Sequence, residues 1–277
     1  MIKEINSLKN PIIKNLFQLK EKSKQRRAQG LFIIEGKREV LLAVNSGYTI
    51  KTIYFDPLLF DLQKLKQLEN HQIEWVKINA KIYEKVAYRG STEGVFAVAQ
   101  SKNLTLDELK IDSKTPLILV AESPEKPGNI GALLRTADAA NVDAVFIADP
   151  KTDVYNPNVI RSSVGGLFCT QVVVGSSAEL IDYLSAQKIE IYSAILQDSK
   201  PYTALNYKKP TALVVGTESD GLTEQWRVAA NQCIHIPMLG KVDSMNVSVA
   251  AGILMLKQNV NVDLTNSSST NCLYIFY

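Results

Sequence analysis

Three polar segments of the chain share one arrangement, because each follows a short apolar run. They are P-G-N-I-G-A-L-L-R-T-A at residues 127–137, G-T-E-S-D-G at residues 216–221 and K-V-D-S-M-N at residues 241–246. In open α/β sheets, ligands bind at the carboxyl ends of the strands, where such segments lie. Polar groups that converge there can position a substrate and stabilise charge that develops in a reaction. The candidate site residues are Asn129, Arg135, Glu218, Ser244 and Asn246.

Each segment taken alone has a plainer structural explanation. Ordinary strand-to-helix turns also use glycines for positive φ and a residue such as Ser244 as an N-cap. Arg135, six residues after Asn129, would then be a charge on a helix surface. The presence of three such segments in one chain favours a shared site over three independent turns.

The elements that position these segments are predicted from the apolar runs. Residues 117–120, 213–215 and 233–238 form short runs that are typical of buried parallel strands. Other strands and helices alternate with them, which predicts a mostly parallel, doubly wound sheet. The last helix, residues 247–258, is apolar over most of its circumference and must be buried on more than one side. The remaining expected elements are strands at 144–147, 171–174 and 189–194, helices at 130–140 and 178–186, and a turn or short helix at 159–165.

In order and spacing, the three polar segments resemble the signature motifs of the SpoU-type (TrmH-like) 2′-O-ribose RNA methyltransferases, a branch of the SPOUT methyltransferases. The resemblance covers roughly Pro116 to Gln258. It implies an α/β/α methyltransferase domain at residues 116–260, with a deep trefoil knot that holds S-adenosylmethionine. It also implies a homodimer that pairs through this domain. Rules of chain topology alone would have excluded the knot.

The resemblance also implies roles for individual residues. Arg135 matches the catalytic arginine, which meets the phosphate of the target nucleotide and helps to activate the 2′-hydroxyl. A guanidinium stays protonated in proteins, so electrostatic positioning and stabilisation of an alkoxide are favoured over proton abstraction. Asn129, Glu218, Ser244 and Asn246 match the other polar positions and are expected to orient Arg135, the ribose and the knot loops. The positions expected to hold the cofactor are Gly216, Thr217, Ile236, Met238, Met245 and Asn246.

Other functions remain open from the residues alone. Gly128 and Gly131 follow a strand and open a helix, as in a nicotinamide or flavin oxidoreductase, but the full G-x-G-x-x-G pattern is absent. A protein that only binds RNA through a degenerate knot is a third alternative, which the intact motif positions disfavour. Within the methyltransferases, ribosomal RNA is favoured over transfer RNA because a separate N-terminal domain precedes the motifs.

The positive charge of the chain is concentrated near its N-terminus. Residues 1–28 hold eight Lys or Arg against two Glu, a charge of +6, whereas the whole chain carries +3 and the remainder therefore carries −3. A basic end on a nearly neutral body predicts contacts with RNA phosphates, although a solvated helix face explains the same pattern. Arg161, in a segment that matches the family, is a further RNA candidate. The residues expected to bind RNA are Lys20, Lys22, Lys24, Arg26, Arg27 and Arg161.

The N-terminal part resembles the L30e-like substrate-binding domain of the same family. A basic helix that begins at Asn10 and Pro11 is expected first. Residues 1–100 would form this domain, residues 101–115 a polar linker or a short helix at 107–110, and residues 261–277 a tail without chemistry. The expected elements are strands at 31–34, 50–55, 74–78 and 95–99 and helices at 37–45, 57–68 and 81–88.

Composition limits the remaining classes. Apolar residues make up 46% and charged residues 21% of the 277 positions, which is typical of globular domains. No apolar run suits a signal peptide or a membrane span, so a cytoplasmic protein is expected. Two histidines and three scattered cysteines predict no metal site.

Overall fold

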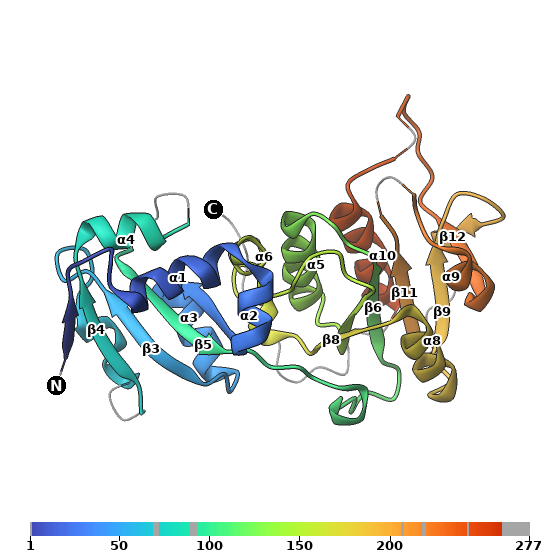
Figure 1. Cartoon of the computed structure of the whole chain (residues 1–277). Coiled ribbons are helices and arrows are strands. Elements are labelled where there is room, and N and C mark those ends of the chain that lie inside the picture. Colours follow the sequence, from blue (N-terminus) through green and yellow to red (C-terminus); the bar gives the residue numbers. More distant parts are fainter. Residues whose placement is uncertain are drawn as a thin grey trace.

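A computed structural model of the protein describes residues 2–68, 72–88, 93–205, 208–217, 220–242 and 244–261. They form two α/β bodies, each built on its own sheet (Figure 1). The N-terminal body extends to the end of β5 (Val95–Gln100), and the C-terminal body begins with β6 (Leu117–Glu122).

The N-terminal body contains a five-stranded mixed sheet in the order β1-β4-β3-β5-β2. Strands β1, β4 and β3 are parallel, whereas β5 runs antiparallel to both β3 and β2. Side chains alternate across the sheet: Ile33 packs with α1 and α4 on one face, and Phe32 and Ile34 pack with α3 on the other. The elements are β1 (Lys3–Ile5), α1 (Pro11–Glu21), α2 (Ser23–Gln29), β2 (Leu31–Glu35), α3 (Lys37–Asn45), β3 (Ile50–Phe55), η1 (Leu62–Leu68), β4 (Glu74–Ile78) and α4 (Ala80–Val86).

The helix predicted at residues 57–68 is wrong in its first half. The backbone N–H of Leu58 donates to the Asp56 side chain, and that of Gln63 donates to the Asp61 side chain, both at 3.0 Å. Such short carboxylate bonds compete with helix formation. The segment therefore begins with a turn and forms only the 3₁₀ helix η1.

The C-terminal body contains a seven-stranded sheet in the order β10-β12-β9-β11-β6-β7-β8, and every pairing in it is parallel. Helices α5 and α10 cover one face, and α8 and α9 cover the other. The predicted doubly wound parallel sheet is confirmed. The elements are α5 (Pro127–Ala139), β7 (Ala144–Ala148), α6 (Pro157–Ser163), α7 (Gly166–Cys169), β8 (Val172–Gly175), α8 (Ser177–Ala186), β9 (Glu190–Ala194), β10 (Lys200–Pro201), η3 (Tyr202–Ala204), β11 (Thr211–Val215), α9 (Glu224–Ala229), β12 (Gln232–His235) and α10 (Val247–Asn261).

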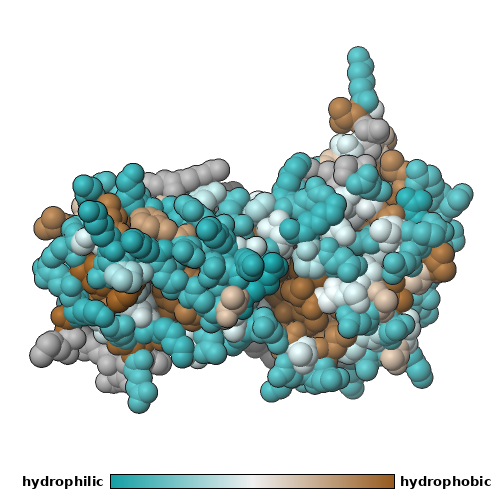
Figure 2. Space-filling view, in the orientation of Figure 1, coloured by the Kyte–Doolittle hydropathy of each residue, from teal (hydrophilic) through white to brown (hydrophobic). Residues whose placement is uncertain are grey.

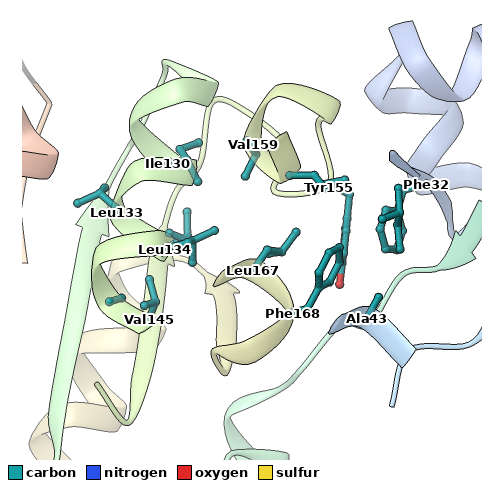
Figure 3. Packing of buried hydrophobic residues seen from close by; sticks show 14 of the residues in the cluster. Phe32, Ala43, Ile130, Leu133, Leu134, Val145, Tyr155, Val159, Leu167 and Phe168 are labelled. Carbon is teal, nitrogen blue, oxygen red and sulfur yellow. The ribbon is translucent and has the colours of Figure 1, made fainter. Parts of the chain in front are cut away.

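One hydrophobic core runs through the junction of the two bodies (Figure 3). The ring of Phe32 lies 4.4 Å from that of Tyr155 and 6.3 Å from that of Phe168, measured between ring centres. Gly165 lies so close to Leu42 that an added Cβ would be 2.3 Å from its methyl carbon. Because cores are densely packed, these contacts fix how the N-terminal body sits on the C-terminal one.

The segment predicted as a polar linker, residues 101–115, is packed along the outer edge of β8. Leu104 forms a parallel bridge with Val173, and the leucines at 104, 106 and 109 contact the core beneath α8. The Gln171 side chain accepts from the backbone N–H of Lys110 at 3.1 Å and donates to its carbonyl at 2.6 Å. The short helix in this segment is the 3₁₀ turn η2 (Leu106–Glu108).

Candidate active site

A cavity of about 120 Å³ opens at the carboxyl ends of β6 and β11, beside the first turns of α5 and α10. This is the edge of the sheet at which the sequence placed the candidate site. Its lining combines apolar walls with carboxylate, amide, hydroxyl and ammonium groups. The residues are Ala121, Glu122, Pro124, Glu125, Lys126, Asn129, Leu133, Gly216, Thr217 and Val247.

The loop after β11 folds tightly back on itself. Thr217 and Gly221 exchange two backbone hydrogen bonds of 3.1 and 3.2 Å, and the Thr217 hydroxyl accepts from the backbone N–H of Asp220 at 3.0 Å. A Cβ added to Gly216 would lie 2.2 Å from the carbonyl oxygen of Gly221. Glycine is therefore required here by the close approach of the loop's own backbone.

Two of the sequence motifs meet through Asn129 and Asn246. The Asn246 amide donates to Oδ1 of Asn129 at 3.2 Å, across 117 positions of sequence. Oδ1 of Asn246 also accepts from the backbone N–H and the hydroxyl of Ser248, at 3.0 and 2.6 Å. Asn246 thus caps α10 while it contacts α5, and the capping role considered for Ser244 belongs to Asn246 instead.

Several predicted site residues lie outside the cavity lining. Arg135 is exposed on α5, the helix that carries Asn129, and Ser244 is exposed. Ile236, Met238 and Met245 are half-buried in the segment between β12 and α10, which projects from the body at the orange-red end of the ribbon in Figure 1. Ile236 packs against the core that includes Ala121 and Leu133 beside the cavity, although none of the three side chains is among the lining residues. Glu218 lies outside the described residues.

The structure adds Glu122, which the sequence prediction missed. Its side chain is 3% exposed at the end of β6 and lines the cavity. It accepts hydrogen bonds from the backbone N–H of Thr223 at 2.8 Å and from the Thr223 hydroxyl at 2.6 Å. Its position directly after a buried apolar run was the available signal, since the same rule selected the other candidates.

The predicted RNA-binding residues differ in exposure: four are exposed, Lys20 is half-buried and Arg26 is buried. Lys22, Lys24 and Arg27 are exposed on the N-terminal body. Arg161 is exposed on α6, with its guanidinium carbon 6.0 Å from the centre of the Tyr88 ring.

Lys20 is half-buried, and its ammonium group donates to the carbonyls of Lys85 and Ala87 at 3.2 and 2.9 Å. Arg26 requires a correction, because it is 3% exposed and its Nε donates to Oδ2 of Asp153 at 2.6 Å. A guanidinium held in a buried ion pair does not face RNA.

The described residues offer neither a metal site nor a membrane-spanning helix. They contain no group of three or more His, Cys, Asp or Glu placed to hold a metal ion. Within the same part of the chain, no helix combines the length and apolarity needed to cross a bilayer.

Comparison with known proteins gives two family matches. Residues 116–256 match the SpoU rRNA Methylase family, and residues 10–97 match the MRM3-like substrate binding domain. The boundary between the two matches falls in the segment that packs along β8. The two bodies of the structure thus correspond to two separately recognised domains.

Individual relatives align over nearly the whole chain. The 23S rRNA (guanosine(2553)-2′-O)-methyltransferase RlmP of Bacillus subtilis is 29% identical over 92% of this chain and 98% of its own. A crystal structure of an RNA 2′-O ribose methyltransferase is 34% identical, with a TM-score of 0.81 over 94% of this chain and 99% of its own. An AdoMet-bound rRNA methyltransferase from Sinorhizobium meliloti is 26% identical, with a TM-score of 0.87 over 94% and 98%. The chain belongs to the SpoU rRNA methylase family.

Proposed function

We propose that this protein transfers a methyl group from S-adenosylmethionine to a ribose 2′-hydroxyl of ribosomal RNA. The observation that carries the proposal is the cavity at the ends of β6 and β11, where Asn129 meets Asn246 beside Gly216 and Thr217. The full-length relative in Bacillus subtilis is named for this reaction on 23S rRNA, which supports ribosomal over transfer RNA. An rRNA substrate would place the reaction in the cytoplasm.

The cavity residues fit an adenosine-based cofactor. Ala121, Leu133 and Val247 offer apolar surface for a base, while Asn129 and Thr217 offer groups for hydroxyl and amino partners. When bound, S-adenosylmethionine supplies an electrophilic methyl group. The residues at the carboxyl ends of β6 and β11 would hold it. The assignment of Ile236, Met238 and Met245 to the cofactor rests on the resemblance, and the packing of Ile236 against the core beside Ala121 and Leu133 supports it for that residue.

Arg135 is assigned to the RNA. It is exposed on the helix whose first turn borders the cavity, so its guanidinium can reach a phosphate outside the cofactor site. A planar guanidinium suits a phosphate, and its fixed charge stabilises a developing 2′-alkoxide. Asn129 and Asn246 orient the ribose and the loops, and Ser244 and Glu218 keep the roles that the resemblance implies.

The N-terminal body is assigned to RNA binding, with Lys22, Lys24 and Arg27 as exposed phosphate contacts. The match to a substrate-binding domain over residues 10–97 supports this division of labour. Arg161, on the α6 side of the junction, extends the same set towards the catalytic body. Lys20 contributes less, because two carbonyls already engage its ammonium group.

A homodimer through the knotted C-terminal domain is also proposed. Leu239 is 98% exposed, and Val242, Val249 and Leu256 are exposed on or beside α10. The segment that carries Leu239 stands out from the molecule in Figure 2. Exposed apolar side chains such as these suit burial against a second copy. A monomer at micromolar concentration by light scattering would remove this proposal.

The function is tested by binding and by RNA mapping. S-adenosylhomocysteine should raise the melting temperature of the protein, whereas NAD should not. Ribosomal RNA from cells without the gene should lack one 2′-O-methyl group that the purified enzyme restores with S-adenosylmethionine. Complete methylation of ribosomal RNA in both strains would contradict the rRNA assignment.

A further inference from the structure

The loop between β11 and α9 is described at residues 216, 217 and 220–223, and both of its ends are fixed. Its first residue, Gly216, continues β11, which is paired with β6 up to the pairing of Val215 with Ala121. Near its other end, Leu222 is buried beneath α9. Between these points, Thr217 and Gly221 hold the loop closed through their two backbone hydrogen bonds. The shape of the cavity wall thus depends on where the far end of the loop is anchored.

Glu122 supplies that anchor. Its buried carboxylate accepts two hydrogen bonds, and both come from Thr223. Burial of a carboxylate is costly unless its oxygens accept hydrogen bonds, so these two bonds are strongly favoured where the site excludes water. Glu122 and the loop residues Gly216 and Thr217 line the same cavity. The carboxylate therefore connects the sheet, the loop and the cavity.

The side chain of Thr223 bonds to Glu122 and does not cap its own helix. Thr223 is the N-cap residue of α9, and such a hydroxyl usually accepts a hydrogen bond from the first turn of its helix. Here the oxygen of the hydroxyl forms no side-chain cap, and its hydrogen is donated to Glu122. The Thr223 side chain thus ties the start of α9 to the cavity, while its carbonyl accepts from the backbone N–H of Arg227 at 3.3 Å.

We propose that Glu122 is a positioning residue that holds residues 216, 217 and 220–223 of the loop after β11 in the arrangement that binds S-adenosylmethionine. The inference rests on the proposed function and names a residue that acts through the loop. The contribution of Glu122 is the geometry of the loop, so it applies equally to S-adenosylmethionine and to S-adenosylhomocysteine, which lacks the sulfonium charge.

The test compares ligand affinity by calorimetry in the full-length protein. Glu122→Gln and Thr223→Val should each weaken both ligands by about tenfold to a hundredfold, as expected when hydrogen bonds to a buried charge are removed. Thr223→Ser keeps the hydroxyl and should restore wild-type affinity. The KM for S-adenosylmethionine should rise more than kcat falls. Thr223→Val leaves the carboxylate and its backbone donor in place, so it decides the matter if Glu122→Gln fails to fold.

Glu179→Gln is the matched control. Glu179 also accepts from one backbone N–H and one hydroxyl, those of Ser176 at 2.9 and 2.7 Å, but it lies outside the cavity lining. The Glu179→Gln variant should bind S-adenosylmethionine and S-adenosylhomocysteine with wild-type affinity. If Glu122→Gln and Thr223→Val both bind the ligands with wild-type affinity, the inference about Glu122 is overturned but the proposed function is not. The same holds if these variants lose affinity for S-adenosylmethionine only. A wild-type protein that binds neither ligand would overturn the proposed function itself.

Discussion

Nε of Arg26 lies 2.6 Å from Oδ2 of Asp153, 127 positions further along the chain, and both side chains are almost fully buried. The same guanidinium donates to the carbonyls of Leu19 and Lys20 at 2.7 and 3.1 Å. Asp153 in turn accepts from the backbone N–H of Tyr155 at 2.8 Å. Arg26 therefore ties α2 and the end of α1 to the loop before α6, across the junction of the two bodies.

Replacement of Arg26 should destabilise the fold. Arg26→Gln would leave the Asp153 carboxylate buried without its partner, and loss of about 3–5 kcal/mol of unfolding free energy is expected. Urea titration followed by circular dichroism measures it. Arg27→Gln, at the exposed neighbouring position, should change stability by no more than about 0.5 kcal/mol. Equal stability of the two variants would show that the ion pair does not hold the junction.

The exposed basic residues should govern the salt dependence of RNA binding. Lys22, Lys24 and Arg27 changed together to Gln should weaken binding and reduce the slope of log K against log salt by roughly 0.7 to 0.9 for each RNA phosphate that is no longer neutralised. Binding titrations between low and moderate salt measure the slope. Arg26→Gln should leave it unchanged. An unaltered slope in the triple variant would make these side chains a solvated helix face only.

Arg135 should matter for chemistry and not for cofactor affinity. Arg135→Ala should lower kcat by at least about a hundredfold, as removal of a group that stabilises developing charge does. The affinity for S-adenosylhomocysteine should stay within a few-fold, because Arg135 is outside the cavity lining. Arg135→Lys should rescue poorly, since an ammonium does not reproduce the planar fork. Near-normal turnover of Arg135→Ala would rule out the assigned role.

A methyl group at Gly216 should disrupt the cofactor loop. The added Cβ of Gly216→Ala would meet the Gly221 carbonyl at 2.2 Å, so the loop must move, at a cost of about 1–3 kcal/mol. Loss of S-adenosylhomocysteine binding by calorimetry is the expected result. Gly175→Ala, whose Cβ makes only ordinary contacts of 3.5 Å and above, serves as control. Unchanged affinity in Gly216→Ala would mean that the loop adapts freely.

The domain junction should weaken at alkaline pH. Burial raises the pKa of both Tyr48 and Tyr155, whose hydroxyls lie 3.5 Å apart. The folded state thus holds these protons more tightly than the unfolded state, so their contribution is complete below about pH 10 and is lost as pH rises above it. The free energy of unfolding should be measured from roughly pH 8 to 11, a range that contains the ordinary tyrosine pKa. It should fall less with rising pH in Tyr48→Phe than in the wild-type protein. Identical pH dependence of the wild-type protein and Tyr48→Phe would contradict a contribution of the Tyr48 hydroxyl to stability.

Local pattern could place residues at the edge of the sheet where the signal lies within one segment. Asn129, Gly216 and Thr217 line the cavity because each follows a buried run at the carboxyl edge of the sheet, which periodicity can show. The prediction that Arg26 binds RNA was wrong because the burial of Arg26 depends on Asp153. A run of basic residues gives no indication of such a distant partner. The same limit applies to the segment between β12 and α10. Its projection from the body depends on tertiary packing, which no local pattern shows.

The packing of residues 101–115 along β8 has a further consequence. A parallel sheet that ends in an uncovered strand offers its free N–H and C=O groups to other chains, and β8 is such an outer strand. Leu104 occupies that edge through its bridge to Val173. A fragment that begins at residue 116 would lack this cover and should aggregate, whereas one that begins at 101 keeps it. The boundary drawn by sequence families is therefore not the boundary at which the chain can be cut.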